Sequence, residues 1–188
     1  EVLTEIARAA LGLDGVDGCR IALWRRELDD VELAADETVD DWSTLYRAGE
    51  YLPLADWPSY REAMTRGRVR SFHTKDPDVH ARERANLLAD GIYSGTVIPI
   101  AIGDESHGFL ALHARQRRRF GESARRFASE LAAQAAAAID RARLFDALQR
   151  RAETDGLTGL LNHRAAQEAL DRELTLARAA KTSLSVVL

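Results

Sequence analysis

The sequence lacks cysteine pairs, a long apolar run and a leader-like N-terminus, and each absence excludes a class of protein. Cys19 is the single cysteine among 188 residues. One cysteine rules out an intramolecular disulfide framework and a cysteine-rich metal site, and it fits a reducing compartment. No apolar stretch reaches the ~18 residues that a membrane-spanning helix needs, and no signal peptide is recognisable. We therefore expect a cytoplasmic location, or the cytoplasmic side of a membrane-anchored parent protein, with no membrane contact in these residues.

The chain also lacks an excess of positive charge. Its formal net charge is −4, with 46% hydrophobic and 30% charged residues, which is ordinary for a globular protein. No global basic field argues for a nucleic-acid partner. A local basic cluster consists of Arg115, Arg117, Arg118, Arg119, Arg125 and Arg126. This cluster could contact phosphate groups, but a solvated loop and helix start is the favoured interpretation, and we predict no nucleic-acid binding.

Hydrophobic periodicity predicts alternating helices and strands. We expect helices over residues 1–11, 60–66, 79–89 and 122–152, and strands over 19–25, 31–35, 69–73, 95–102 and 109–114. In the first strand, Cys19 and Ile21 would face one side, and Arg20 and Ala22 the other. This order of elements predicts an α+β fold, with helices packed on an antiparallel sheet.

Turn-forming residues set several of the expected boundaries. Ser59 is a candidate N-cap for the helix that Gly67 would end. Pro99, inside a predicted strand, indicates an edge position or a bulge. We also expect a loop over residues 103–108 and an acidic loop made of Asp36, Glu37, Asp40 and Asp41.

The stretch from residue 122 to 152 contains no glycine and no proline and is rich in strong helix formers. Its apolar positions recur in steps of three and four along Leu131, Ala135, Ala138, Ala142 and Phe145. We expect its first half to cover the chain's own sheet and its second half to pair with another copy. Leu144, Phe145 and Leu148 would otherwise form an unexplained apolar patch. The prediction is a parallel homodimer through the helices at residues 1–11 and 123–152.

Residues 155–164, Asp-Gly-Leu-Thr-Gly-Leu-Leu-Asn-His-Arg, predict a tight turn between two helices. Gly156 and Gly159 permit a compact backbone, and Asn162 is a good N-cap for a helix over residues 163–179. Asp155 could pair with Arg164 across the turn. A β-branched strand would then begin at residue 184.

The same segment resembles the opening signature of GGDEF domains, which follows a long helix. The matching positions are Asp155, Leu157, Thr158, Gly159, Leu160, Asn162 and Arg164. His163 departs from the family's frequent arginine. Seven agreements at fixed spacing in the expected context make the resemblance specific. In the family, the first Mg²⁺-binding aspartate follows the strand expected at residues 184–188, so the resemblance implies that the catalytic residues lie beyond Leu188.

Residues 1–150 resemble GAF domains. The features are the strand with Ile98-Pro99-Ile100, the strand over 108–112, the basic loop with Phe120 and the alanine-rich helix. The resemblance implies a GAF/PAS-like antiparallel sheet flanked by helices, with a long C-terminal signalling helix. The expected organisation is a GAF sensor domain over residues 1–122, a linker or coiled-coil helix over 123–152 that also packs on the GAF sheet, and the truncated start of a GGDEF domain over 153–188.

Together the two resemblances imply the small-molecule-sensing and dimerising region of a bacterial diguanylate cyclase, which makes cyclic di-GMP from two GTP molecules. Mg²⁺ and GTP would belong to the parent's GGDEF domain. Residues 1–188 would carry no cofactor and no catalytic residue and would be inactive alone. The alternative is a ligand-free dimerisation scaffold in a signalling protein whose GGDEF domain is degenerate. A GAF transcriptional regulator would need a DNA-binding domain where the motif at residues 155–164 stands.

Aromatic residues gather between positions 40 and 95, where a GAF ligand would bind. The candidate pocket consists of Trp42, Trp57, Tyr60, Phe72 and Tyr93. An unknown small molecule could occupy an aromatic-lined pocket of this kind. Packing of an irregular region explains the same residues and is the favoured interpretation. The Asn-Lys-Phe-Asp-Glu signature of cyclic-nucleotide-binding GAF domains is absent, which argues against that ligand.

The remaining candidate ligands are Cys19 and the histidines. Bilin-binding GAF relatives attach their chromophore in a later loop–helix region, so Cys19 is interpreted as a small buried hydrophobe. His73, His80, His107 and His113 are dispersed without paired metal spacing, and we predict no metal site. A haem ligand among His73 and His80 is kept as a minor hypothesis.

Overall fold

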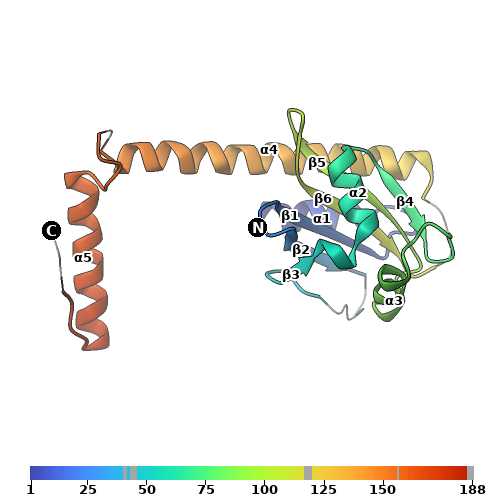
Figure 1. Cartoon of the computed structure of the whole chain (residues 1–188), viewed down its shortest axis with the longest axis horizontal. Coiled ribbons are helices and arrows are strands. Elements are labelled where there is room, and N and C mark those ends of the chain that lie inside the picture. The colour runs from blue at the N-terminus through green and yellow to red at the C-terminus, as the bar shows by residue number, and fades with distance from the viewer. Residues whose placement is uncertain (40–41, 43–45, 117–119, 156, 186–188) are drawn as a thin grey trace. The chain divides into compact units, whose positions relative to one another are not determined.

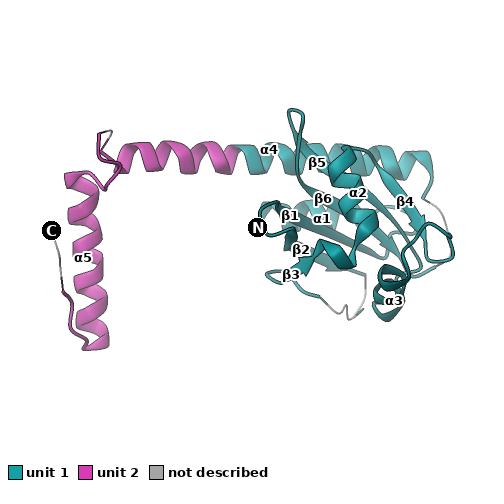
Figure 2. Ribbon diagram, in the orientation of Figure 1, with its two compact units in different colours: residues 1–140 teal, residues 141–188 magenta. Residues whose placement is uncertain are grey.

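The computed structural model describes residues 1–39, 42, 46–116, 120–155 and 157–185 (Figure 1). The chain forms two compact units, residues 1–140 and residues 141–188, and each is described by itself (Figure 2). None of the helices in these ranges combines the length and the hydropathy needed to cross a bilayer.

The described part of the first unit contains one antiparallel sheet of six strands in the order β3-β2-β1-β6-β5-β4. The strands are β1 (Gly18–Arg25), β2 (Asp30–Thr38), β3 (Tyr51–Pro53), β4 (Arg70–His73), β5 (Ser94–Ile102) and β6 (Glu105–Ala114). The helices are α1 (Val2–Ala10), the 3-10 turn η1 (Leu54–Asp56), α2 (Pro58–Arg66), α3 (Ala81–Ala89) and α4 (Glu122–Glu153). The α+β class predicted from the order of elements is confirmed.

One face of the sheet is covered by α1 and by the first part of α4. The buried residues of α4 recur at helical spacing and are Ala128, Leu131, Ala132, Ala135, Ala136 and Ile139. They pack with Ile6 and Ala10 of α1 on Cys19 and Ile21 of β1.

The opposite face of the sheet is covered by η1, α2 and α3 (Figure 1). Ala22 of β1 and Leu33 of β2 pack there against Trp57, Tyr60 and Leu87. The alternation predicted for the first strand is therefore confirmed, since its odd positions face one core and its even positions the other.

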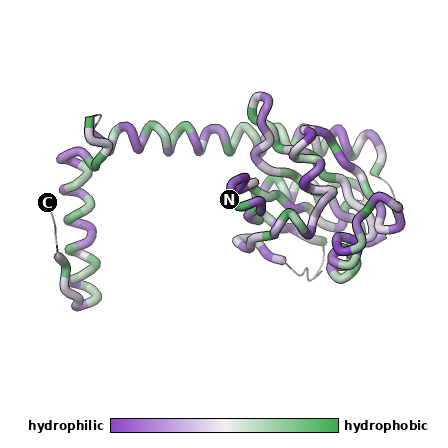
Figure 3. Tube along the Cα trace, viewed as in Figure 1, coloured by the Kyte–Doolittle hydropathy of each residue, from purple (hydrophilic) through white to green (hydrophobic). Residues whose placement is uncertain are grey.

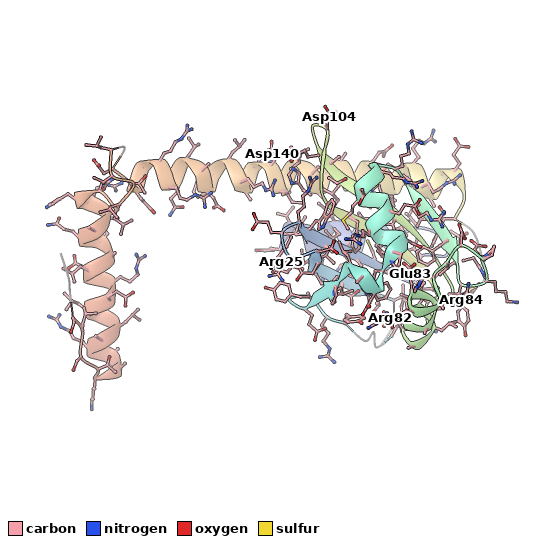
Figure 4. All side chains as sticks on the ribbon, viewed as in Figure 1. Arg25, Arg82, Glu83, Arg84, Asp104 and Asp140 are labelled. Atoms are coloured by element: carbon pink, nitrogen blue, oxygen red, sulfur yellow. The ribbon has the colours of Figure 1, made fainter. Side chains whose placement is uncertain are left out.

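Two predicted loops are wrong in part. Asp36 and Glu37 belong to β2, where they pair with Arg20 and Cys19 of β1, because Asp36 gains an ion pair there. Asp40 and Asp41 lie outside the described residues. The strand β6 begins at Glu105 rather than after a six-residue loop, because Gly103 takes a left-handed conformation (φ 61°) and closes a tight turn with Asp104 at its tip (Figure 4).

The helix α2 starts at Pro58, since a proline at the first helical position loses no hydrogen bond. The N-cap is Trp57, so the cap predicted at Ser59 is wrong. The end of α2 at Gly67 (φ 59°) is confirmed. Pro99 pairs with Phe109 of β6, whereas β4 reaches only as far as Val97. The chain at Pro99 is therefore a local edge, as predicted.

The second unit holds the rest of α4 and α5 (His163–Ala180). Asn162 caps α5 by accepting a hydrogen bond from the backbone N–H of Ala165 at 3.0 Å, as predicted. Of the strand predicted from residue 184, Leu184 and Ser185 have no regular structure, and residues 186–188 lie outside the described residues.

Candidate functional site

An aromatic cluster forms on the sheet face covered by α2. Trp57, Tyr60 and Phe72 of the predicted pocket come together with Phe109 of β6, and all four are buried. The ring centroids of Trp57 and Tyr60 lie 5.3 Å apart, and those of Tyr60 and Phe109 5.0 Å apart, in edge-to-face arrangements. Such pairs stabilise a core beyond their buried area. Most of this cluster is therefore part of the packed hydrophobic core.

Of the other two residues of the predicted pocket, Trp42 is partly buried and packs against the same core, whereas Tyr93 lies outside the aromatic cluster. The Trp42 indole N–H donates to the backbone oxygen of Asp90 at 3.0 Å, and its ring is so close to Gly18 that a Cβ there would overlap it. Tyr93 is half-buried, and its backbone joins Ala114. Neither residue lines the interior cavity described next.

A small cavity of about 10 Å³ lies beside the aromatic cluster. It is lined by Arg20, Val31, Leu52, Leu54, Trp57, Tyr60 and Phe109. That is about the room of one water-sized molecule, far below the volume of an ordinary ligand pocket. The indole N–H of Trp57 is buried and has no hydrogen-bond partner among the described residues.

A buried ion network borders this cavity. The guanidinium of Arg20 donates to Asp36 Oδ1 and to Asp90 Oδ2, each at 2.9 Å. Burial disfavours the charge of Arg20, but Asp36 and Asp90 outweigh burial and raise its pKa. The network ties β1 to β2 and to the end of α3. Sequence reasoning missed it, and the available signal was an arginine at a strand position whose neighbours on that face are apolar.

His113 forms a second buried polar contact on this face. Its Nε2 lies 2.8 Å from the hydroxyl of Tyr60, and both side chains are buried. Burial, with the charge of Arg20 adding to it, holds the pKa of His113 well below its usual value, so the imidazole is neutral. Burial raises the pKa of Tyr60, which therefore stays protonated.

Glu83 of α3, which is labelled in Figure 4, accepts hydrogen bonds at the N-terminus of α2. Its carboxylate accepts from the Ser59 backbone N–H at 3.1 Å and from the Ser59 hydroxyl at 2.8 Å. A carboxylate at this position fills the role that Ser59 was predicted to play, because it takes an unpaired N–H and suits the helix dipole. Burial raises the pKa of Glu83 against the effect of these hydrogen bonds.

The other candidates have local structural roles. Cys19 is fully buried in the core beneath α1, and burial raises the pKa of its thiol. The Nδ1 atoms of His73 and His80 accept backbone N–H groups two residues further on, from Lys75 and Arg82. Within the described ranges, no group of three His, Cys, Asp or Glu residues is arranged to hold a metal ion.

The basic cluster is described only in part, because Arg117, Arg118 and Arg119 lie outside the described residues. Arg115 and Arg125 are exposed, as is Arg126. The guanidinium of Arg115 lies 5.8 Å from the centre of the Trp42 ring. Arg115 therefore has a local packing role.

In the second unit, the segment at residues 155–164 is held by its own polar groups. Asp155 Oδ1 accepts from the Thr158 backbone N–H at 3.0 Å and from the Thr158 hydroxyl at 2.9 Å. These hydrogen bonds lower the pKa of Asp155. The predicted pair of Asp155 with Arg164 is wrong, since Arg164 pairs with Glu168 one helical turn away.

Asn162 closes the same turn from the other side. Besides capping α5, its side-chain amide donates to the backbone oxygen of Ala152 at 2.7 Å, and its own backbone N–H donates to Glu153. Of the matched residues, Leu157 and Leu160 are left exposed by the turn, at 95% and 70% of their surface, and Gly159 has a left-handed φ of 71°. The motif therefore contains two kinds of residue: polar residues that form the turn, and leucines that are exposed.

The predicted dimer seam falls on both sides of the boundary between the units. Leu131 and Ala135 are buried against the chain's own sheet, and Ala138 is half-buried. Ala142 and Phe145 are exposed. The first half of the seam therefore packs on the chain's own sheet, and the second half is open to a partner.

A family model for the GAF domain matches residues 1–140. Among solved structures, the blue-light-absorbing form of the PixJ GAF domain of Thermosynechococcus elongatus is similar, with a TM-score of 0.65 at 17% identity, covering 78% of this chain and 88% of that one. The GAF domain of a two-component sensor histidine kinase from Bacillus halodurans gives 0.64 at 18%, covering 77% and 95%. The second GAF domain of DevS from Mycobacterium smegmatis gives 0.59 at 19%, covering 78% and 96%. No curated protein matches the sequence.

Proposed function

Because this chain belongs to the GAF domain family over residues 1–140, we propose that it is the regulatory region of a cytoplasmic or membrane-anchored diguanylate cyclase. In this proposal, the GAF domain senses a small molecule and the motif at residues 155–164 opens the GGDEF domain. Mg²⁺ and GTP would bind to residues further along the parent protein. The residues of this chain would carry the regulatory state from one domain to the next.

The turn at residues 155–164 is the observation that carries the proposal. Three of its matched polar residues, Asp155, Thr158 and Asn162, hold the turn through side-chain hydrogen bonds. Their identity is therefore explained by the turn, and their spacing agrees with the family's opening signature.

The dimer is part of the same proposal. Cyclic di-GMP requires two GTP molecules to meet, so two GGDEF domains must face each other, and positioning supplies much of the catalysis. Apolar and polar positions alternate along α4 (Figure 3). Three of its large apolar residues, Leu144, Phe145 and Leu148, are exposed. A second copy of α4 would cover them.

The test is cyclase activity of the parent protein. Purified parent protein is incubated with GTP and Mg²⁺, and cyclic di-GMP is measured by liquid chromatography. We expect product from the intact protein and none from residues 1–188 alone. A dimeric, Mg²⁺-loaded parent that forms no cyclic di-GMP would reject the cyclase and favour a scaffold.

The ligand-free scaffold is the second candidate, and the packed interior favours it. A cavity of about 10 Å³ holds no ordinary metabolite unless the walls move. In that case the GAF domain would serve only to bring two copies together. Native mass spectrometry of the protein purified from its host discriminates the two, since a sensor is expected to retain a bound small molecule.

A further inference from the structure

We infer that the interior cavity beside Trp57 receives a small apolar group, so that the ligand class sensed by this domain is apolar rather than ionic. The inference rests on the proposed sensing role and deepens it. The atoms of the wall that face the cavity are apolar. The apolar residues of the lining include Val31, Leu54, Trp57 and Phe109. A cavity with such walls stays dry and takes apolar atoms.

Of the polar groups in the wall, those of Arg20 and Tyr60 are engaged elsewhere, and the indole N–H of Trp57, which has no partner among the described residues, presents no polar surface to the cavity. Arg20 is the charged residue of the wall, and its guanidinium already donates to Asp36 and Asp90 at 2.9 Å. The Tyr60 hydroxyl is hydrogen-bonded to His113. An anion or an ammonium group would therefore enter the cavity without a partner and would lose its hydration. An apolar group carries no such penalty.

The wall also has a side that can open. Leu52 and Leu54 form it, from β3 and η1. The strand β3 has three residues and pairs only with β2 in the described sheet, while Tyr51 and Pro53 are exposed. A short edge strand with few ladder bonds opens at lower free energy than the centre of a sheet. We place the entry route for the ligand beside β3.

Xenon is the probe for the wild-type cavity, because it is apolar and small. Residues 1–188 are equilibrated with increasing xenon pressure, and methyl signals are followed by NMR. We expect saturable shifts for Val31, Leu52 and Leu54. Val31→Ile adds one methylene to the wall, fills the cavity and should abolish these shifts. Shifts that do not saturate, or that persist in Val31→Ile, overturn the inference.

A second pair of variants tests the ligand class. Leu54→Ala enlarges the cavity, and we expect benzene to bind at least about tenfold more tightly than to the wild-type protein, since roughly two more methylene-sized contacts become available. Leu54→Met keeps the volume and is the matched control. Benzoate should bind Leu54→Ala more weakly than benzene. If benzoate binds more tightly, Arg20 recruits anions and the apolar assignment is wrong.

These outcomes are separate from those of the cyclase test. Cyclic di-GMP formation by the parent reports on the GGDEF domain and needs no occupied cavity. Xenon and benzene binding report on residues 1–140 and need no cyclase. Either result can fail while the other stands.

Discussion

At the scale of single residues, the GAF interior contains two groups of buried polar side chains that pair with each other. Arg20 meets Asp36 and Asp90, and His113 meets Tyr60. Removing one member of such a group leaves the other buried without compensation, which costs more than the pair itself contributes. Substitutions at these residues therefore report directly on the network.

We predict that Arg20→Gln lowers the free energy of unfolding by about 3–5 kcal/mol, because two buried carboxylates lose their guanidinium partner. Urea denaturation of wild-type and variant measures the loss. The matched control is Arg82→Gln, whose pair with Asp56 leaves the arginine 67% exposed and should contribute at most about 1 kcal/mol. Equal losses in the two variants would contradict the role given to burial.

The neutral state of His113 makes stability depend on pH. Its pKa in the folded state lies below the ordinary value of 6.5, so below that pH the unfolded chain binds the proton more readily. This contribution to stability is complete above about pH 7.5 and is lost as the pH falls toward the folded-state pKa. Between pH 7.5 and 5.5 the wild-type protein should lose about 1.4 kcal/mol more than His113→Gln.

The comparison with His113→Gln isolates one group from the others. Glu83 acts with the opposite sign, because a raised pKa favours the folded state as the pH falls. Its effect is present in both proteins and cancels in the difference. Urea unfolding at the two pH values is the measurement, and parallel losses in both proteins would show that His113 is not the titrating group.

At the scale of elements, the close approach of β1 and β6 depends on a glycine. Gly108 pairs with Leu23, and a Cβ at this position would overlap the carbonyl oxygen of Ala22. The backbone of Ala22 cannot move aside as a flexible side chain could. The pairing of these two central strands therefore accepts no side chain at residue 108.

Gly108→Ala is expected to destabilise the protein by about 2 kcal/mol or more, since β1 and β6 must separate locally. Gly121→Ala is the control, because a Cβ there meets nothing within 4 Å, and its effect should stay within about 0.5 kcal/mol. Thermal unfolding of both variants measures the difference. A stable Gly108→Ala protein would mean that the two strands can shift without cost.

At the scale of the whole molecule, α4 has two apolar parts, one buried on the sheet and one exposed. One face of α4, from Ala128 to Ile139, is buried on the sheet, whereas Phe145 and Leu148 are 67% and 64% exposed. The sequence shows one continuous apolar stripe, and the fold divides it. The dimer proposed from that stripe is therefore assigned to its exposed second half.

We expect residues 1–188 to have twice the monomer mass in light scattering at micromolar concentration. The double variant Phe145→Glu and Leu148→Glu should be monomeric, because charges would replace the apolar contact. Leu88→Glu, at a 46% exposed leucine of α3, is the control and should stay dimeric. A wild-type monomer would remove the dimer from the proposal.

The sequence by itself determined the order of the helices and strands of the first unit apart from β3 and η1, the cap at Asn162, the end of α2 at Gly67 and the two faces of β1. Each of these depends on residues close together in the chain, where apolar period and cap chemistry are local properties. It also singled out Trp57, Tyr60 and Phe72, but it did not show that Tyr93 lies outside their cluster.

The partners of the buried polar side chains could be identified only from the tertiary structure. Arg20 and Asp90 are 70 positions apart, and Tyr60 and His113 are 53 apart, so no local pattern pairs them. The same holds for Glu83, which takes over the cap of α2 from a neighbouring helix across 24 positions. Buried polar groups take whatever partner the fold brings to them, because leaving them unpaired costs too much free energy.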